Sequence, residues 1–190
     1  MLDVYIDFKS PGSYLALEPT LALAKRTGIE LQWRPFKTHE RDIPNQGTDE
    51  TLAMTHHRVR TQSLRDTHIK YANLRGIDLR FPPVVNQTDL ALGVLSEIRG
   101  DPISFIMAAF AAYWDTHQDL NANTIVSGII SSSGVSHSGD LTGALASFQA
   151  AQAQAEALDI VNAPGYVIDQ QLFIGRQHLP WIERIAKDQI

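Results

Sequence analysis

The sequence has 190 residues, a formal net charge of −5 and 44% hydrophobic residues, which fits one globular domain, alone or with an inserted subdomain. It has no apolar run near the ~20 residues of a membrane-spanning helix and no basic block, so we expect neither a membrane span nor a nucleic-acid partner. The cysteine count is zero, which excludes disulfides, thiolate metal sites and dithiol redox chemistry by the protein itself.

The first predicted elements are a strand, a turn and a helix. Residues 2–7 have the apolar pattern of a buried strand, and residues 11–27 have that of an amphipathic helix. Ser10 has the residue type of an N-cap, Pro11 suits the first helical position, and Gly28 suits the position after the last turn. The residues expected on the buried face of this helix are Tyr14, Leu17, Leu21 and Ala24.

Two serine hydroxyls, those of Ser10 and Ser13, are therefore predicted at a helix N-terminus. The N–H groups at this end have no intrahelical partner, and the helix dipole places partial positive charge there. Such a place favours an anion, including a thiolate.

A second strand is predicted over residues 29–36, where apolar and polar side chains alternate. A strand–helix–strand order implies a parallel strand pair with a right-handed crossover. Residues 37–50 are polar and are expected to form a loop, with Lys37 at its start as a candidate for facing a ligand.

Five helices are predicted between this unit and the end of the chain. Their expected ranges are about 48–74, 87–99, 102–114, 122–131 and 141–158, the last of them capped by Asp140 and rich in Ala and Gln. Asn86 is expected to open the second of these helices, and residues 131–134 are expected to form a loop.

The chain is expected to end in a β-hairpin and a helix. Asn162-Ala163-Pro164-Gly165 leads into a strand that ends at Ile168, and Asp169-Gln170 suits the turn. A partner strand follows up to Gly175, and residues 178–187 have the pattern of a last helix.

Both ends of the chain resemble one known family. Asp7-Phe8-Lys9-Ser10-Pro11-Gly12-Ser13-Tyr14 resembles the opening of the 2-hydroxychromene-2-carboxylate isomerase family, which belongs with kappa-class glutathione transferases in the DsbA-like branch of thioredoxin folds. The order of Pro164, strand, turn, strand, Gly175 and helix resembles the C-terminal half of the same folds. In redox relatives the N-terminal turn reads Cys-x-x-Cys, whereas both of its ends are serine here.

The resemblance implies an α/β, thioredoxin-like fold with a large all-helical insertion, of the DsbA and kappa glutathione transferase type. Residues 1–38 and 159–190 are then the thioredoxin-like domain, and 39–158 are the helical insertion, whose last helix packs back on the sheet. The proline at position 164 is cis in that family, and the residue before it presents its backbone to a peptide-like ligand.

The resemblance also implies a chemistry. Glutathione is expected as the cofactor, with Ser10 as the catalytic residue that stabilises its thiolate. The thiolate would add reversibly to a conjugated α-keto acid and so permit rotation about its double bond, which is covalent catalysis by a borrowed nucleophile. The residues expected to bind glutathione are Pro11, Ser13, Asn86, Ala163, Pro164, Gln177 and His178.

The substrate is expected to be a small aromatic or α-keto acid, as in the breakdown of aromatic hydrocarbons. Its carboxylate needs a cation, and the candidates are Lys37, Arg34 and Arg80. A homodimer is expected from the resemblance. The chain begins directly with a strand and shows no secretory signal, so a cytoplasmic location is expected.

Two departures from the family leave other functions open. Gly165-Tyr166 replaces the usual Thr-Phe after the proline, and Gln177 stands where the family has an acid that helps to hold the γ-glutamyl end of glutathione. A glutathione transferase of kappa type would use the same site but release a thioether. A catalytically silent thioredoxin-like binding protein is the alternative outside the enzymes.

Other chemistries have less support in the sequence. His56 and His57 are adjacent, so on a helix their side chains diverge, and His39-Glu40 lacks the second histidine of a zinc-binding H-E-x-x-H motif. No metal site is expected. A Ser–His–Asp hydrolase stays open, because the partners of a triad come from anywhere in a chain.

Overall fold

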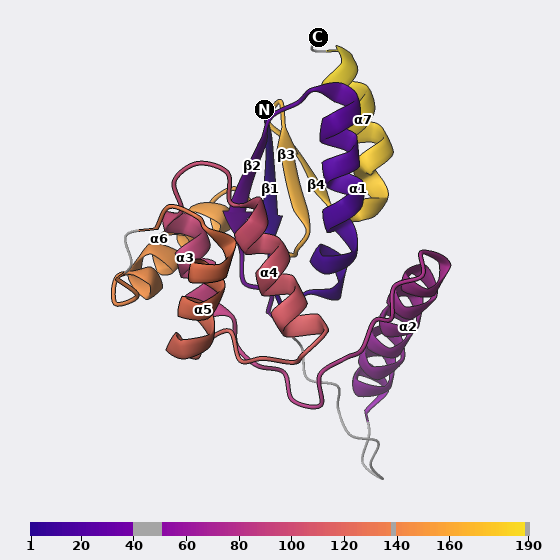
Figure 1. Ribbon diagram of the computed structural model, residues 1–190. Coiled ribbons are helices and arrows are strands. Elements are labelled where there is room, and N and C mark those ends of the chain that lie inside the picture. The colour runs from indigo at the N-terminus through magenta and orange to yellow at the C-terminus, as the bar shows by residue number, and fades with distance from the viewer. Residues whose placement is uncertain (40–50, 138–139, 189–190) are drawn as a thin grey trace. The chain divides into compact units, whose positions relative to one another are not determined.

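The computed structural model, which describes residues 1–39, 51–137 and 140–188, contains a mixed four-stranded sheet (Figure 1). The strand order is β2-β1-β3-β4, with β1 parallel to β2 and antiparallel to β3, and with β3 antiparallel to β4. The strands are β1 (Leu2–Ile6), β2 (Leu31–Pro35), β3 (Gly165–Ile168) and β4 (Gln171–Ile174).

Helix α1 (Pro11–Thr27) connects the two parallel strands, as the sequence predicts. It begins after Ser10, which is its N-cap, and it ends where Gly28 adopts a left-handed φ of 72° and donates its N–H to Ala24 O. Glycine carries no Cβ and takes this conformation without steric cost.

Five helices lie between β2 and β3 in the described part of the chain, and their number matches the prediction. They are α2 (Leu52–Leu74), α3 (Asp89–Glu97), α4 (Ile103–Trp114), α5 (Asn123–Ser133) and α6 (Ala144–Glu156). The predicted start of the first at residue 48 lies outside the described residues. None of the described helices is long and apolar enough to cross a membrane.

The chain forms two compact units. One comprises residues 1–38 and 81–190 and contains the sheet, and the other comprises residues 39–80 and contains α2. The predicted division has other boundaries, with a thioredoxin-like domain over 1–38 and 159–190 and a helical insertion over 39–158. It stays a prediction.

The end of the chain is a tight hairpin followed by helix. Asp169 and Gln170 have φ values of 49° and 62°, and positive φ at both central residues is what a type I′ two-residue hairpin turn requires. A short 3₁₀ turn (Arg176–His178) then leads into α7 (Leu179–Asp188).

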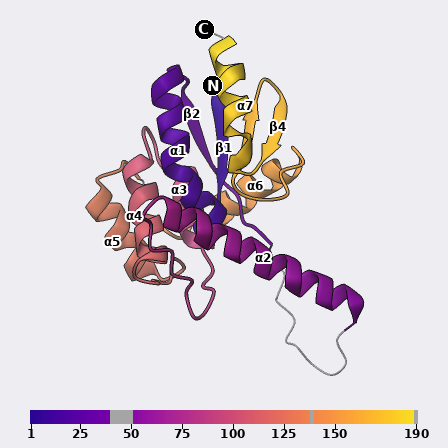
Figure 2. The same ribbon diagram turned by 90° about the vertical axis from the view of Figure 1, so that its right-hand side faces the viewer.

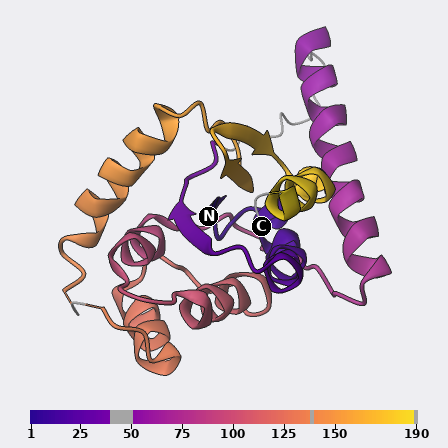
Figure 3. The same cartoon turned by 90° about the horizontal axis from the view of Figure 1, so that it is seen from above.

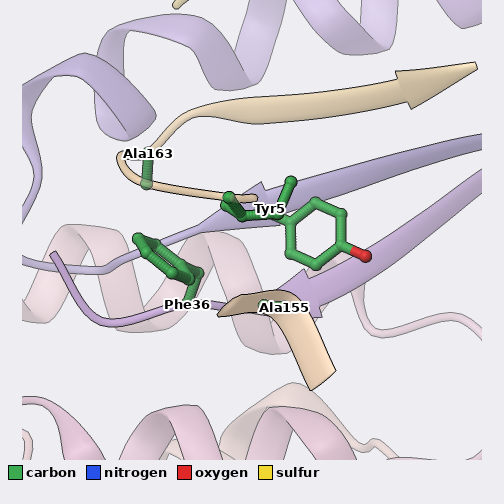
Figure 4. Packing of buried hydrophobic residues seen from close by; sticks show 5 residues of the cluster. Tyr5, Phe36, Ala155 and Ala163 are labelled. Atoms are coloured by element: carbon green, nitrogen blue, oxygen red, sulfur yellow. The ribbon is translucent and has the colours of Figure 1, made fainter. Parts of the chain in front are cut away.

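Helices cover both faces of the sheet. Helices α1 and α7 lie side by side on one face (Figures 1 and 2), where the Arg26 guanidinium hydrogen-bonds Glu183 and, with Lys187, lowers the pKa of that carboxyl to about 2. On the other face the Tyr5 ring packs with Phe36, Ala155 of α6 and Ala163 (Figure 4). Helix α3 lies next to α6, and both contact β2 (Figure 3).

The predicted buried face of α1 is wrong. Tyr14, Leu17, Leu21 and Ala24 are only partly buried, whereas the buried face carries Leu15, Ala16 and Leu23 together with the threonines 20 and 27. The two threonines tolerate burial because their hydroxyls are bonded, one with Tyr166 Oη at 3.1 Å and one to Leu23 O at 2.9 Å.

Three further predictions about helix ends are corrected. Asn86 does not open a helix, since α3 begins at Asp89. Residues 131–133 belong to α5, where their hydroxyls bond carbonyls three or four residues back. Asp140 does not cap α6, because its carboxylate accepts hydrogen bonds from the N–H and hydroxyl of Thr142, before the helix begins at Ala144.

Candidate functional site at the Ser10 turn

The Ser10 hydroxyl joins the start of α1 to a loop from the far end of the chain. Ser10 Oγ accepts a hydrogen bond from Ser13 N at 3.2 Å, which is the N-cap interaction predicted from the sequence. It also donates to Ala163 O at 3.0 Å across 153 positions of sequence. The peptide bond between Ala163 and Pro164 is cis. The two stretches that the sequence singled out therefore meet at one hydroxyl group.

Gly12 allows the turn to lie close against this loop. A Cβ placed on Gly12 would lie 3.1 Å from Pro164 Cδ, 3.4 Å from Ala163 O and 3.5 Å from Ser10 Oγ. These three groups thus converge on one point beside the helix N-terminus. The Gly12 N–H has no hydrogen-bond partner among the described residues, and it is one of the donors that a helix leaves open at this end.

Asp7 ties the turn to two other segments. Its Oδ2 accepts hydrogen bonds from Thr38 N at 2.8 Å and Thr38 Oγ1 at 2.7 Å, and its Oδ1 accepts from Thr88 Oγ1 at 2.8 Å and Lys9 N at 3.2 Å. Its own N–H donates to Ser13 Oγ at 3.3 Å, and its carbonyl accepts from Ser10 N at 3.1 Å. The Asp7 side chain therefore holds three parts of the chain in place: Lys9 in the turn, Thr38 after β2 and Thr88 before α3.

Burial raises the pKa of Asp7, while Lys9 and the hydrogen bonds from Thr38 and Thr88 oppose this shift. The folded protein then holds the Asp7 proton more tightly than the unfolded chain does. Asp7 therefore contributes fully to the free energy of unfolding at pH values below its pKa in the unfolded chain. This contribution is lost as the pH rises through the pKa that Asp7 has in the folded protein.

Comparison with Asp7→Asn tests this direction. The asparagine does not titrate, so we expect the wild type to lose unfolding free energy relative to the variant as the pH rises from about 4 towards neutrality, by at most ~1.4 kcal/mol per pH unit. Urea unfolding of both proteins between these pH values measures the difference. A difference that grows in favour of the wild type with rising pH would mean that the pKa is lowered instead.

The loop around Pro164 is held by its own hydrogen bonds. Ala163 N donates to Asn162 Oδ1 at 2.9 Å, and Pro164 O accepts from Gly175 N at 2.8 Å. The second bond brings the turn after β4 beside the proline. A Cβ on Gly165 would lie 3.3 Å from both Asn162 O and Ile160 Cγ2, so the backbone at Gly165 packs closely against this loop.

Gln177 and His178 follow this loop in the 3₁₀ turn. Gln177 Nε2 donates to Ile174 O at 3.0 Å, so the amide folds back over Gly175. The His178 ring lies 5.7 Å from the Phe173 ring, centre to centre. The connection through Gly175 therefore places both predicted residues in the turn attached to Pro164.

The predicted substrate cations are not gathered at the turn. Arg34 Nε donates to Asp3 Oδ1 at 2.9 Å, near the start of β1, whereas Ser10 follows its end. Lys37 Nζ pairs with Asp89 Oδ2 at 2.9 Å, beside the segment that Asp7 holds. Arg80 pairs with Asp78 and belongs to the other compact unit.

The remaining predicted residues differ in their surroundings. Pro11 is the first residue of α1. Ser13 is 1% exposed and its hydroxyl accepts from Asp7 N, so it supports the turn from inside. Asn86 is partly buried in the irregular segment before Thr88.

An aromatic cluster lies behind the turn. Trp114 Nε1 donates to Phe8 O at 2.9 Å, and the Tyr14 ring stacks on Trp114 at 5.6 Å with an interplanar angle of 15°. Burial, followed by the nearby Asp115 carboxylate, raises the pKa of Tyr14. The cluster fixes the backbone just before Ser10.

Sequence reasoning missed Asp7, Thr38, Thr88 and Asn162 as parts of the site. Asp7 could have been recognised from the sequence, because an acid at the end of an apolar strand, two residues after the buried Tyr5, is expected to be buried and to need partners. Thr38 and Thr88 could not have been recognised in this way, since they are 31 and 81 positions away from Asp7 in the sequence. In the described ranges, no three His, Asp or Glu side chains are grouped so that they could hold a metal ion.

Comparisons with known proteins agree with this architecture. Residues 1–185 match the model of the DsbA-like thioredoxin domain. The chain is 26% identical to 2-hydroxychromene-2-carboxylate isomerase of Sphingobium xenophagum over 200 residues, which cover 98% of each protein. It also resembles a solved structure of a 2-hydroxychromene-2-carboxylate isomerase, with a TM-score of 0.72, 20% identity and coverage of 99% of this chain and 95% of the other.

A probable DsbA oxidoreductase from Streptomyces coelicolor is also similar in structure, with a TM-score of 0.67 and 16% identity over 99% of this chain and 88% of the other. These findings confirm the predicted resemblance and the predicted thioredoxin-like fold. The chain belongs to the DsbA-like thioredoxin domain family.

Proposed function

We propose that this protein is a glutathione-dependent isomerase of a conjugated α-keto acid, similar to 2-hydroxychromene-2-carboxylate isomerase. The observation that carries the proposal is the Ser10 hydroxyl at the N-terminus of α1, bonded to Ala163 O of the loop with the cis proline. The similarity along the whole chain to an isomerase of that name supports it.

Two groups at the start of α1 fit a thiolate. The Ser10 hydroxyl lies at this helix end, and so does the N–H of Gly12, whose lack of a side chain lets the turn lie close against the loop at Ala163 and Pro164. A hydroxyl, an amide N–H and a helix dipole are the groups that lower a thiol pKa. Gln177 Oε1 is the acceptor for the ammonium group of the γ-glutamyl end, without the charge that an acid would add.

Glutathione, when bound, supplies a thiol whose thiolate adds reversibly to the conjugated double bond of the substrate. Ser10 then changes partner, because its proton is bonded to Ala163 O in the structure and is needed by the thiolate. Asp7 holds the backbone N–H groups of Lys9 and Ser10 while this happens. Lys37 is the cation we assign to the substrate carboxylate, and it is 27% exposed in its pair with Asp89.

The test is an incubation with 2-hydroxychromene-2-carboxylate, with and without glutathione, followed by product analysis and a count of free thiol. Isomerisation that requires glutathione and leaves the thiol count unchanged supports the proposal. Loss of thiol with formation of a thioether would identify a transferase instead. An absence of reaction with glutathione bound would remove the isomerase assignment for this substrate.

A silent thioredoxin-like binding protein is the second candidate, and a specific observation favours it. The Ser10 proton and the Ala163 N–H are both bonded within the protein, the latter to Asn162 Oδ1. A ligand that uses these groups must displace the present partners. A protein that binds no glutathione and activates no thiol would support this candidate.

A further inference from the structure

A groove of about 1010 Å³ runs along the outer edge of β2, away from the Ser10 turn. All residues from Glu30 to Pro35 line it. Helix α6 forms one wall, and the end of α3 with the following turn forms the other. The volume is at the upper end of the usual range for ligand sites, roughly 300–1,000 Å³, and nothing in the proposed isomerase reaction uses it.

The floor of the groove is an open strand edge. Leu2 N donates to Glu30 O and Phe36 N donates to Ile6 O, so the even-numbered residues of this stretch turn their main chain towards β1. The alternation of a strand then turns the main chain of Leu31, Trp33 and Pro35 outward. In the part of the chain that the structure describes, β2 is the last strand on this side of the sheet. Two N–H groups and three carbonyls thus face the groove.

Small side chains on α6 keep the groove open. Ala150, Ala151 and Ala155 lie on the wall that faces β2, and Gln154 lies between them. This is the Ala- and Gln-rich helix whose composition the isomerase chemistry does not explain. Larger residues at these positions would fill the space beside the strand.

Two contacts set the distance of α6 from the rest of the domain. At its start, the Ala144 carbonyl packs against Gly93 of α3 so closely that a Cβ on Gly93 would lie 2.1 Å from Ala144 O. Further along, Gln152 Oε1 accepts a hydrogen bond from Lys37 N at 2.8 Å, just past the end of β2. The groove is therefore built into the fold and needs no rearrangement to exist.

The charge along the groove is acidic. Its lining includes Asp3, Glu30 and Asp101 against the single cation Arg34, and that cation is already paired with Asp3. Glu30 and Asp101 are both exposed. An occupant with basic side chains is favoured, because its charge is complementary to these two carboxylates.

We propose that this groove binds an extended, basic peptide segment of a partner protein, which adds to the sheet as a fifth strand beside β2. The main chain of the peptide pairs with Leu31 and Trp33, and its side chains alternate between the α6 wall and the α3 wall. Strand addition to an open sheet edge is a recurrent form of peptide recognition, in which main-chain hydrogen bonds give affinity.

The test uses a fluorescent, blocked heptapeptide of alternating valine and lysine, titrated with the full chain at low salt. We expect saturable binding, and binding at least tenfold weaker for the same peptide N-methylated at every residue, which keeps its charge but donates no main-chain hydrogen bonds. Amide hydrogen exchange at Leu31 and Trp33 is expected to slow when the unmodified peptide binds. Equal binding of the N-methylated peptide, unchanged exchange, or no saturation at millimolar protein would each overturn the proposal.

A matched pair of variants tests the position. Ala150 and Ala153 are both exposed alanines of α6, but only Ala150 lines the groove. Leucine is a good helix former, so both substitutions should fold. Ala150→Leu is expected to weaken peptide binding at least tenfold, and Ala153→Leu to leave it within twofold. An equal effect of the two variants would contradict binding beside β2.

Discussion

Ser10→Ala is expected to lower kcat/KM for the glutathione-dependent isomerisation roughly 100-fold or more. The variant removes the one hydroxyl that lies at the N-terminus of α1 and contacts the loop with the cis proline. Removal of a single donor that stabilises developing negative charge typically costs about 10²–10³ in rate. Steady-state kinetics of the wild type and the variant, with saturating glutathione, measure the change.

The variant also loses a helix cap, which costs about 1 kcal/mol of stability. Thr51→Ala is a matched control, because Thr51 Oγ1 caps α2 through Met54 N at 3.2 Å, as Ser10 Oγ caps α1 through Ser13 N. We expect Thr51→Ala to show a similar loss of cap stability with full activity. If Ser10→Ala also retains full activity, Ser10 has no role in the reaction.

Gly93→Ala is expected to cause the largest loss of stability, about 3 kcal/mol or more. The added Cβ would lie 2.1 Å from Ala144 O and 2.5 Å from Ala144 C. These are backbone atoms, so α3 and α6 must separate along the contact that sets the groove. At roughly 2–4 °C per kcal/mol for a chain of this size, the melting temperature should fall by about 6 °C or more.

Gly128→Ala provides the control for this prediction. Gly128 is an exposed residue within α5, and nothing lies within 4 Å of the position its Cβ would take. Alanine is the better helix former by about 1 kcal/mol, so the variant should melt at a slightly higher temperature than the wild type. A mild effect of Gly93→Ala, comparable to that of Gly128→Ala, would show that α3 and α6 do not pack as described.

The sequence was sufficient to predict the elements that depend only on residues close together in the chain. The Ser10 cap, the Gly28 stop and the Asp169-Gln170 turn each depend on residues within a few positions of one another. The order of the helices followed in the same way. These features give the fold most of its outline before any tertiary contact is known.

Features that depend on distant partners escaped sequence reasoning. The buried face of α1 was assigned by apolarity alone, but Thr20 is buried because Tyr166, 146 positions later, bonds its hydroxyl. Asp7 holds the turn through Thr38 and Thr88, which no spacing rule connects. Arg34 is a candidate for the substrate carboxylate because of its charge, and only the fold shows that it pairs with Asp3. Burial of a polar group can be predicted only when its partner is known.

A glutathione titration followed by thiolate absorbance tests the central claim most directly, because it needs no knowledge of the substrate. We predict that bound glutathione shows a thiolate signal at neutral pH, with a midpoint below the roughly 8.5 of a free thiol, and that Ser10→Ala removes the signal but not the fold. Binding without a thiolate signal, or a signal unchanged in Ser10→Ala, would contradict thiol activation by the Ser10 turn.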